Sequence, residues 1–294
     1  MIQKLKKIYS SLIVHEDSHE NFNHNYKWFM TDQNEIIGID KKEITPKDAS
    51  LLSTFLIPYD IQFPILTAEE QKWHEMIHKP DTTINFDLKH SYRFVYFSIQ
   101  ENQIEPNTFK DAIQELFSKQ VPILWRNGHE GIIIEVQTTL EESIAYDQII
   151  DILMSDLYVR INFFVGLFQE NVDHISQHYH SFIKSAQTVL SYSKKSVVTY
   201  VDAVPYLLID QSDPNLLHEI TQTILQEYID DDDTLKMIET FVHCNLNISE
   251  TSKELYMHRN SLQYRLDRFL EKTGIDVRQF HHAMAVYLAL LARK

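Results

Sequence analysis

The fold is decided by residues 234–294, TLKMIETFVHCNLNISETSKELYMHRNSLQYRLDRFLEKTGIDVRQFHHAMAVYLALLARK. Apolar residues recur at helical spacing through this stretch, and polar or glycine-containing breaks interrupt them. The pattern predicts a first helix from residue 234, a short second helix over 250–256, and a third from Arg259 to about Lys272. Asn247 followed by Glu250 is typical of a helix N-cap, with Ser249 as the alternative cap, and Thr273-Gly274 is typical of a helix end. Two short helices joined by the tight turn Met257-His258 form a helix-turn-helix unit.

The third predicted helix has one apolar face and one polar face. Leu262, Leu266, Phe269 and Leu270 share a stripe at 100° per residue, which predicts that they are buried. The opposite face carries side chains that suit the major groove of DNA, because Arg can grip guanine and Asn or Gln can grip adenine. The candidate DNA-binding residues are His258, Arg259, Asn260, Ser261, Gln263, Tyr264, Arg265 and Arg268. Asp267 lies near this face and would repel phosphate unless Arg268 or Lys272 offsets its charge.

These residues carry a family resemblance. The run HRNSLQYRL at 258–266, with Thr273-Gly274 after it, resembles the C-terminal helix-turn-helix of PucR/CdaR-type regulators, a relative of the Fis fold. Ser261 stands where the family has Thr, which keeps the hydroxyl, and Ser252 stands where Ala is usual, which would loosen the packing slightly. The resemblance covers about 60 residues. It implies a DNA-binding domain, transcription control as the function, and a preceding domain that resembles a degenerate GGDEF cyclase.

Charge is distributed unevenly along the chain. The 294 residues carry a formal charge of −15, which taken alone argues against a nucleic-acid binder. Residues 234–294, however, hold nine Lys or Arg against six Asp or Glu, a net +3, so the remainder carries −18. Such asymmetry is expected when only one end of a chain meets DNA.

The bulk composition fits a soluble protein of two or three domains. No apolar run reaches the ~18 residues of a membrane span, and the single Cys244 cannot form an intramolecular disulfide, which fits the cytoplasm. Near the N-terminus an apolar set at helical spacing predicts a folded helix instead of a signal peptide. That set is Leu5, Ile8, Tyr9, Leu12 and Ile13.

The middle of the chain predicts a ferredoxin-like sheet, because its elements follow the order β-α-β-β-α-β-α from the strand at 92–100 onward. Asn127-Gly128 between apolar runs indicates a hairpin with a longer or bulged turn. A cyclase would need carboxylates and a glycine pair at this tip to hold Mg²⁺ and nucleotide phosphate. The tip, residues 127–130, has one carboxylate and one glycine. We therefore expect no catalysis, and a structural or dimerising role, with a vestigial ligand site as the alternative.

The predicted fold class is a multidomain α+β chain. Its parts are a mixed α/β sensing region at 1–82, a degenerate GGDEF-like domain at 83–212, a connecting helix with an acidic linker at 213–233, and an all-α helix-turn-helix domain at 234–294. In the first part we expect strands at 26–30 and 35–39 and helices that begin at Thr45-Pro46 and at the capping box of Thr67 and Glu70.

Other clusters predict little chemistry. His174, His178 and His180 lack the Glu or Cys of a zinc motif, so we expect them to face solvent. The acidic run Asp230 to Asp233 favours a linker that caps the next helix, and Cys244 a small buried residue. His281-His282 is expected to be exposed. We expect the last helix, from about 278 to 292, to pack against the helix-turn-helix, with a dimer interface as the alternative.

The sequence thus predicts a cytoplasmic, DNA-binding transcriptional regulator that is not an enzyme. Its expected partners are double-stranded DNA, a second copy of the chain and an unidentified small-molecule effector, with no membrane, metal or cofactor. The alternative is a nucleotide-binding or nucleotide-processing protein with a helical tail that docks onto protein.

Overall fold

The computed structural model describes residues 2–15, 25–31, 35–59, 64, 66–78, 91–101, 103–117, 120–137 and 145–293. The chain divides into two compact units. The first comprises Met1–Phe86 with Phe97–Ile161, and the second Asp87–Tyr96 with Asn162–Lys294. Among the described residues, no helix is long and apolar enough to cross a membrane.

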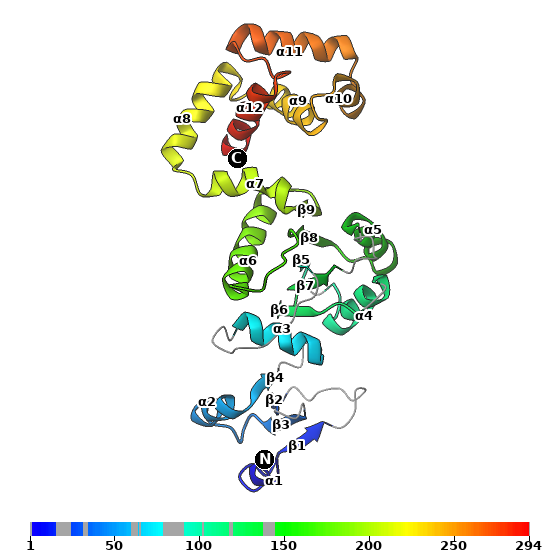
Figure 1. The fold of residues 1–294 in the computed structure, drawn as a ribbon, viewed down its shortest axis with the longest axis vertical. Coiled ribbons are helices and arrows are strands. Elements are labelled where there is room, and N and C mark those ends of the chain that lie inside the picture. Colours follow the sequence, from blue (N-terminus) through cyan, green and yellow to red (C-terminus); the bar gives the residue numbers. More distant parts are fainter. Residues whose placement is uncertain are drawn as a thin grey trace. The chain divides into compact units, whose positions relative to one another are not determined.

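A small antiparallel sheet with the strand order β1-β3-β2-β4 lies in the first unit (Figure 1). The predicted strands at 26–30 and 35–39 are confirmed. Phe29 and Ile37 of this sheet pack against Leu52 and Leu56. The elements of this region are α1 (Ile2–Leu5), β1 (Ile13–His15), β2 (Tyr26–Met30), β3 (Ile36–Asp40), α2 (Pro46–Phe55) and β4 (Ile57–Tyr59).

The predicted N-terminal helix through residue 13 is wrong. Helix α1 ends at Leu5, Ile8 is 68% exposed, and Ile13 pairs with Gly38 of β3. The backbone N–H groups of Ser10 and Ser11 donate to the Glu43 carboxylate at 2.7 and 2.9 Å. These bonds to a residue far along the chain satisfy amides that a longer helix would have paired locally, so tertiary contacts override the helical spacing.

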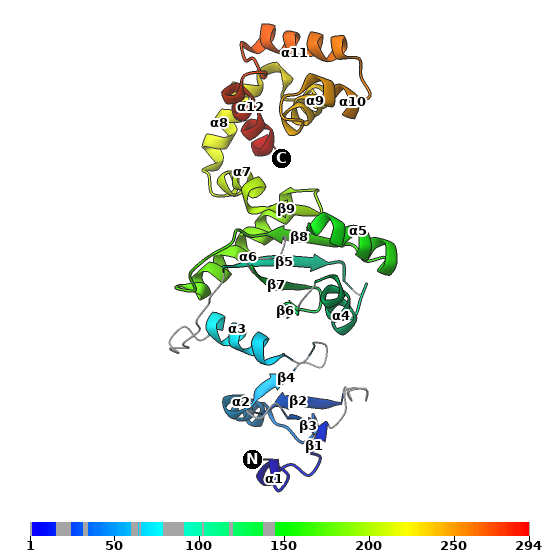
Figure 2. The same ribbon diagram turned by 45° about the vertical axis from the view of Figure 1, so that its right-hand side comes forward.

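A second sheet has the strand order β6-β7-β5-β8-β9, and the division between the two units falls within β5. The predicted order β-α-β-β-α-β-α is confirmed. The elements are β5 (Tyr92–Ile99), α4 (Pro106–Leu116), β6 (Ile123–Asn127), β7 (Glu130–Val136), α5 (Tyr146–Leu157), β8 (Ile161–Val165), α6 (Ile175–Tyr192) and β9 (Val197–Thr199), as Figure 2 shows. The predicted bulged hairpin is also confirmed, since the β6–β7 register shifts between Trp125 and Asn127.

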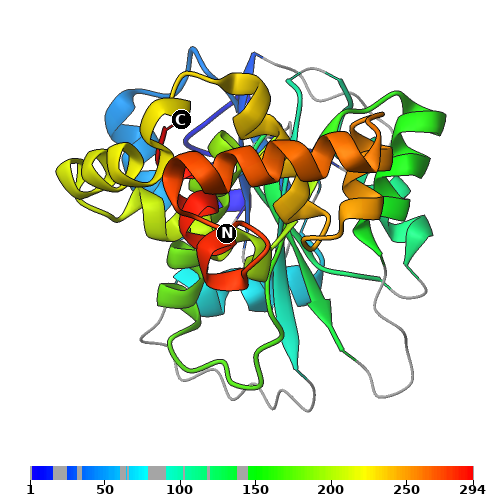
Figure 3. The ribbon, with the colours of Figure 1, turned by 90° about the horizontal axis from the view of Figure 1, so that it is seen from above.

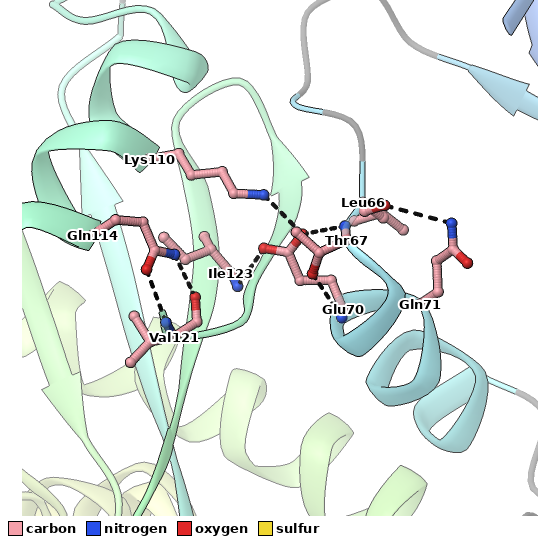
Figure 4. A network of polar contacts seen from close by, with 8 residues as sticks. All are labelled: Leu66, Thr67, Glu70, Gln71, Lys110, Gln114, Val121 and Ile123. Atoms are coloured by element: carbon pink, nitrogen blue, oxygen red, sulfur yellow. Dashed lines mark hydrogen bonds and ion pairs between the residues drawn. The ribbon is translucent and has the colours of Figure 1, made fainter. Parts of the chain in front are cut away.

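Helix α3 (Ala68–His78) is joined to strand β6 and helix α4 through one buried carboxylate (Figure 4). Glu70 is 1% exposed and completes the predicted capping box with Thr67. The same carboxylate accepts from Lys110 Nζ of α4 at 2.8 Å and from the Ile123 N–H of β6 at 2.9 Å. One side chain therefore links three elements.

The expectation that His178 faces solvent is wrong. Its ring stacks on Phe94 of β5 with centroids 5.1 Å apart, and its Nδ1 lies 3.4 Å from the Tyr92 hydroxyl. Burial lowers the pKa of His178 below its ordinary value of 6.5, because the charged imidazolium is poorly solvated there. His174 and His180 are exposed as predicted.

We expect this histidine to make the stability of the protein depend on pH. Because its pKa is lowered only in the folded state, the unfolded chain binds more protons as the pH falls through 6.5. The free energy of unfolding should therefore decrease from about pH 7 to about pH 5. His178→Phe, which keeps an aromatic ring, should flatten this dependence in urea unfolding at several pH values. Equal slopes for the variant and the wild type would contradict the assignment.

The second unit continues into a group of helices with a common core. Leu235 and Phe241 of α9, Leu266 of α11 and Leu290 of α12 are buried together. Leu225, where the connecting helix ends four residues earlier than predicted, joins this core. The helices are α7 (Tyr200–Asp210), α8 (Pro214–Leu225), the 3-10 turn η1 (Gln226–Tyr228), α9 (Asp232–His243), α10 (Ile248–Glu254), α11 (Arg259–Thr273) and α12 (Phe280–Arg293).

Candidate nucleic-acid interface

The predicted N-cap of the short second helix is confirmed. Asn247 Oδ1 accepts from the N–H groups of Ser249 and Glu250 at 2.9 and 3.2 Å. Asp231 caps α9 in the same way, with Oδ1 3.0 Å from the Thr234 amide, as predicted for the acidic run. Side-chain acceptors thus satisfy helix-start amides that have no intrahelical partner, and they fix where each helix begins.

The turn between α10 and α11 is closed by backbone bonds. Tyr256 adopts a left-handed conformation with φ 50°, and the Met257 N–H donates to the Ser252 carbonyl at 2.8 Å. This pattern ends a helix sharply and reverses the chain. Ser252 itself is 5% exposed, and its hydroxyl donates to the Ser249 carbonyl at 3.0 Å. A serine at this buried position is therefore accommodated by a hydrogen bond.

The N-cap of helix α11 is His258, whose Nδ1 accepts from the Asn260 N–H at 3.3 Å. This predicted DNA-binding residue therefore has a local role as N-cap of the helix. The next residues, from Arg259 onward, form the first turn. In Figure 3, α11 runs across the front of the C-terminal helices.

The two faces of α11 are as predicted. Leu262, Leu266 and Phe269 are buried, and Leu270 is half-buried. The predicted DNA-binding side chains are all exposed: His258, Arg259, Asn260, Ser261, Gln263, Tyr264, Arg265 and Arg268. Tyr264, in the middle of this face, is 62% exposed. The face therefore combines guanidinium, amide, hydroxyl and aromatic groups that are open to a ligand.

The arginines of α11 differ in their surroundings. Within the described parts of the chain, Arg259 and Arg268 form no salt bridge. Arg265 lies near Asp231, whose pKa is lowered mainly by hydrogen bonds from Thr234 and further by the charge of Arg265. Arg259 and Arg268 are thus the guanidinium groups of this helix with most freedom to meet phosphates or bases.

Asp267 is offset by a residue that sequence reasoning missed. The sequence offered Arg268 and Lys272 as candidates to offset it, but Arg278 Nη1 lies 2.7 Å from Asp267 Oδ1, while Lys272 Nζ lies 3.3 Å from Glu227 Oε1. Arg278 lies five residues beyond Thr273, the last residue of α11, so it does not share a helix with Asp267. Only the chain reversal after α11 brings the two together, so no sequence signal marks the pair.

The far end of α11 is closed by glycine and by the preceding segment. Gly274 has φ 74°, and its N–H donates to the Leu270 carbonyl at 2.8 Å. Gln226 Nε2 donates to the Thr273 carbonyl, and the Tyr228 hydroxyl donates to the Arg268 carbonyl, both at 3.3 Å. Turn η1, in the predicted connecting helix, therefore supplies hydrogen bonds to the end of α11.

We expect Gly274→Ala to lower the free energy of unfolding by about 1 kcal/mol, because only glycine adopts a positive φ without cost. A Cβ there would meet no atom within 4 Å, so the cost is conformational alone. Gly274→Asn should cost less, since Asn tolerates this conformation better than Ala. Urea unfolding would measure both variants. A larger cost for Asn than for Ala would show that the backbone conformation is not the cause.

The other residues singled out in the sequence lie at the hairpin tip, at the end of α9 and in α12. At the hairpin tip the Glu130 carboxylate already accepts from Asn127 Nδ2 at 3.3 Å and Arg126 Nη1 at 3.2 Å. No group of three or more metal-ligating side chains occurs among the residues that the structure covers. Cys244, predicted to be buried, is half-buried. His281 is exposed as expected, whereas His282 is half-buried and its Nδ1 accepts from the Asp276 N–H at 3.1 Å.

Comparison with known families identifies the class of this interface. Residues 234–292 match the PucR C-terminal helix-turn-helix domain. The segment from α9 to α12 is therefore a helix-turn-helix domain of the PucR type, and α11 is the second helix of its helix-turn-helix pair.

Parts of the chain show distant homology to PucR/CdaR-family regulators. It is 46% identical to the carbohydrate diacid regulator of Escherichia coli (strain K12) over 46 residues, which are 16% of this chain and 12% of that protein. It is 24% identical to the DNA-binding transcriptional activator AdeR of Bacillus subtilis (strain 168), over 54% of this chain and 37% of AdeR. These homologues are transcriptional regulators and not enzymes.

A third relative matches along most of its length. The uncharacterized protein YxkF of Bacillus subtilis (strain 168) is 28% identical over 263 residues, which are 87% of this chain and 86% of YxkF. The similarity therefore extends well beyond the helix-turn-helix domain.

Proposed function

We propose that this protein is a sequence-specific, DNA-binding transcriptional regulator that reads the major groove with the exposed face of α11. The observation that carries the proposal is a PucR-type helix-turn-helix in which every predicted DNA-contacting side chain is exposed. Side chains buried in the domain core could not have contacted DNA. Recognition helices in such units enter the major groove with their N-terminal residues on base edges.

The charges of α11 favour its first half as the reading part. Arg259, Asn260 and Tyr264 lie in the first two turns and are exposed, whereas Glu271 near the end is an exposed acid. A carboxylate facing phosphate is repelled, so the end of the helix should lie away from the DNA backbone. We assign base contacts to Arg259, Asn260, Ser261 and Gln263, and phosphate contacts to Arg265 and Arg268.

Two copies of the chain should bind together. One recognition helix contacts only a few base pairs, and two half-sites multiply specificity. The strongly acidic remainder of the chain, at −18, also opposes binding to DNA. A homodimer adds a second basic face without adding a second kind of site. A role on DNA would place the protein in the compartment that holds the chromosome.

The upstream regions fit a regulatory role better than catalysis. The strand order β6-β7-β5-β8 supports a ferredoxin-like arrangement, in which we assign residues 83–212 to a non-catalytic, GGDEF-like domain. The local bonds of Glu130 leave its carboxylate poorly placed to hold Mg²⁺. We assign effector sensing to residues 1–82. Residues 213–233 would connect the GGDEF-like domain to the helix-turn-helix domain.

The proposal is tested by the salt dependence of DNA binding. The full chain would be titrated against labelled genomic fragments at several salt concentrations, and the logarithm of the binding constant plotted against the logarithm of the salt concentration. Counterion release predicts a straight line of negative slope. No binding, or binding without salt dependence, would reject the proposal and favour a tail that docks onto protein.

A further inference from the structure

The exposed face of α11 that carries the predicted DNA-binding residues from Arg259 to Arg268 is called its reading face below. It contains one acidic residue, Asp267, which is ion-paired. Asn260, Tyr264 and Asp267 are spaced i, i+4 and i+7, so they share one stripe of the helix. The Asp267 side chain is 53% exposed. Because α11 meets a polyanion in the proposed function, an uncompensated carboxylate on this stripe would oppose binding.

Arg278 is held in place to compensate that carboxylate. Its Nη1 lies 2.7 Å from Asp267 Oδ1, and its Nε lies 2.6 Å from Asp276 Oδ1. Its backbone N–H also donates to Asp276 Oδ1, at 3.2 Å. Val277, between Asp276 and Arg278 in sequence, is fully buried and anchors the loop. The guanidinium is therefore fixed by two carboxylates and a buried neighbour, and does not sample the surface freely.

We propose that Arg278 is a positioning residue for DNA binding, which acts by neutralising Asp267 on the reading face and not by touching DNA itself. The inference rests on the proposed function of α11. A close ion pair presents a small dipole to an approaching phosphate, whereas a lone carboxylate presents a full charge, whose field extends over about 8–10 Å at ordinary salt. Arg278 therefore allows the stripe of Asn260 and Tyr264 to approach the DNA.

The chain offers a matched control. Arg293 is also ion-paired, with Nη2 2.7 Å from Asp232 Oδ1, and its side chain is 33% exposed against 34% for Arg278. It lies at the end of α12 remote from α11, as Figures 1 and 2 both show. Arg293→Gln removes the same charge from the same domain at nearly equal exposure. The carboxylate that it leaves unpaired is that of Asp232, which is not on the reading face.

The experiment measures the affinity of full-length variants for a genomic fragment that the wild type binds, after circular dichroism has shown that each variant is folded. Arg278→Gln should weaken binding about three- to tenfold, the effect of one uncompensated charge near phosphate at intermediate dielectric. Asp267→Asn alone should bind as well as or better than the wild type. The double variant should regain the affinity lost in Arg278→Gln, and Arg293→Gln should lose less than Arg278→Gln.

The outcomes separate this inference from the proposed function. If the double variant stays as weak as Arg278→Gln, Arg278 contacts DNA directly or only supports the fold, and the inference is wrong. Weaker binding by Asp267→Asn would overturn it as well, and this arm holds even if Arg278→Gln fails to fold. If the wild type binds no DNA while folded, the proposed function fails, and the inference falls with it.

Discussion

Arg259→Ala is expected to weaken binding to the specific DNA site by about 5- to 150-fold, since a bidentate contact to a base contributes about 1–3 kcal/mol. Arg259 is exposed in the first turn of α11 and forms no salt bridge with the described residues. The substitution removes no buried contact, so the thermal midpoint should remain that of the wild type. Fluorescence anisotropy with a footprinted genomic fragment would measure the loss.

Arg259→Lys provides the matched control. Lysine keeps the positive charge but lacks the planar fork that grips guanine. We therefore expect Arg259→Lys to bind unrelated DNA as the wild type does, while losing most of the preference for the specific site. If Arg259→Ala bound the specific site with unchanged affinity, the assignment of the reading helix would be wrong.

Glu70→Ala is expected to lower the free energy of unfolding by about 3–5 kcal/mol, as is typical when one partner of a buried ion pair is removed. The substitution leaves Lys110 Nζ, which is 15% exposed, without its carboxylate, and the Ile123 amide without its acceptor. It also removes the capping box of α3 at Thr67. Urea unfolding followed by tryptophan fluorescence suits this test, because Trp73 of α3 is fully buried.

Glu69→Ala is the control for Glu70→Ala, since Glu69 lies in the same first turn of α3 but is exposed. We expect it to change the stability by less than about 0.5 kcal/mol. Lys110→Met should destabilise the protein in the wild-type background and much less in Glu70→Ala, because its partner is already gone. Similar effects of Glu69→Ala and Glu70→Ala would show that the buried network contributes little.

The helix-turn-helix could be predicted from sequence because its signals are local. Asn247 caps α10, Gly274 ends α11, and the spacing of Leu262, Leu266 and Phe269 fixes the buried face. Each signal depends on residues within one or two turns of the helix it controls. The hairpin at Asn127 and the capping box at Thr67 are predictable for the same reason.

The remaining features depend on contacts between distant residues. The Glu43 carboxylate ends the N-terminal helix early by binding amides more than 30 positions away. His178 is partly buried because its ring stacks on Phe94. Arg278 lies beside Asp267 because the chain reverses direction after α11. Glu70 is recognisable in the sequence as a capping residue, but its bonds to Lys110 and Ile123 follow only from the packing of α3.

The most direct test of DNA reading by α11 is selection of binding sites by the full-length protein from a pool of random DNA duplexes. The proposed function predicts enrichment of a defined sequence, in the form of two related half-sites if the chain binds as a dimer. The same selection with Arg259→Ala should relax the preference at one base pair in each half-site. A wild-type pool that shows no enriched sequence after repeated rounds would contradict the central claim.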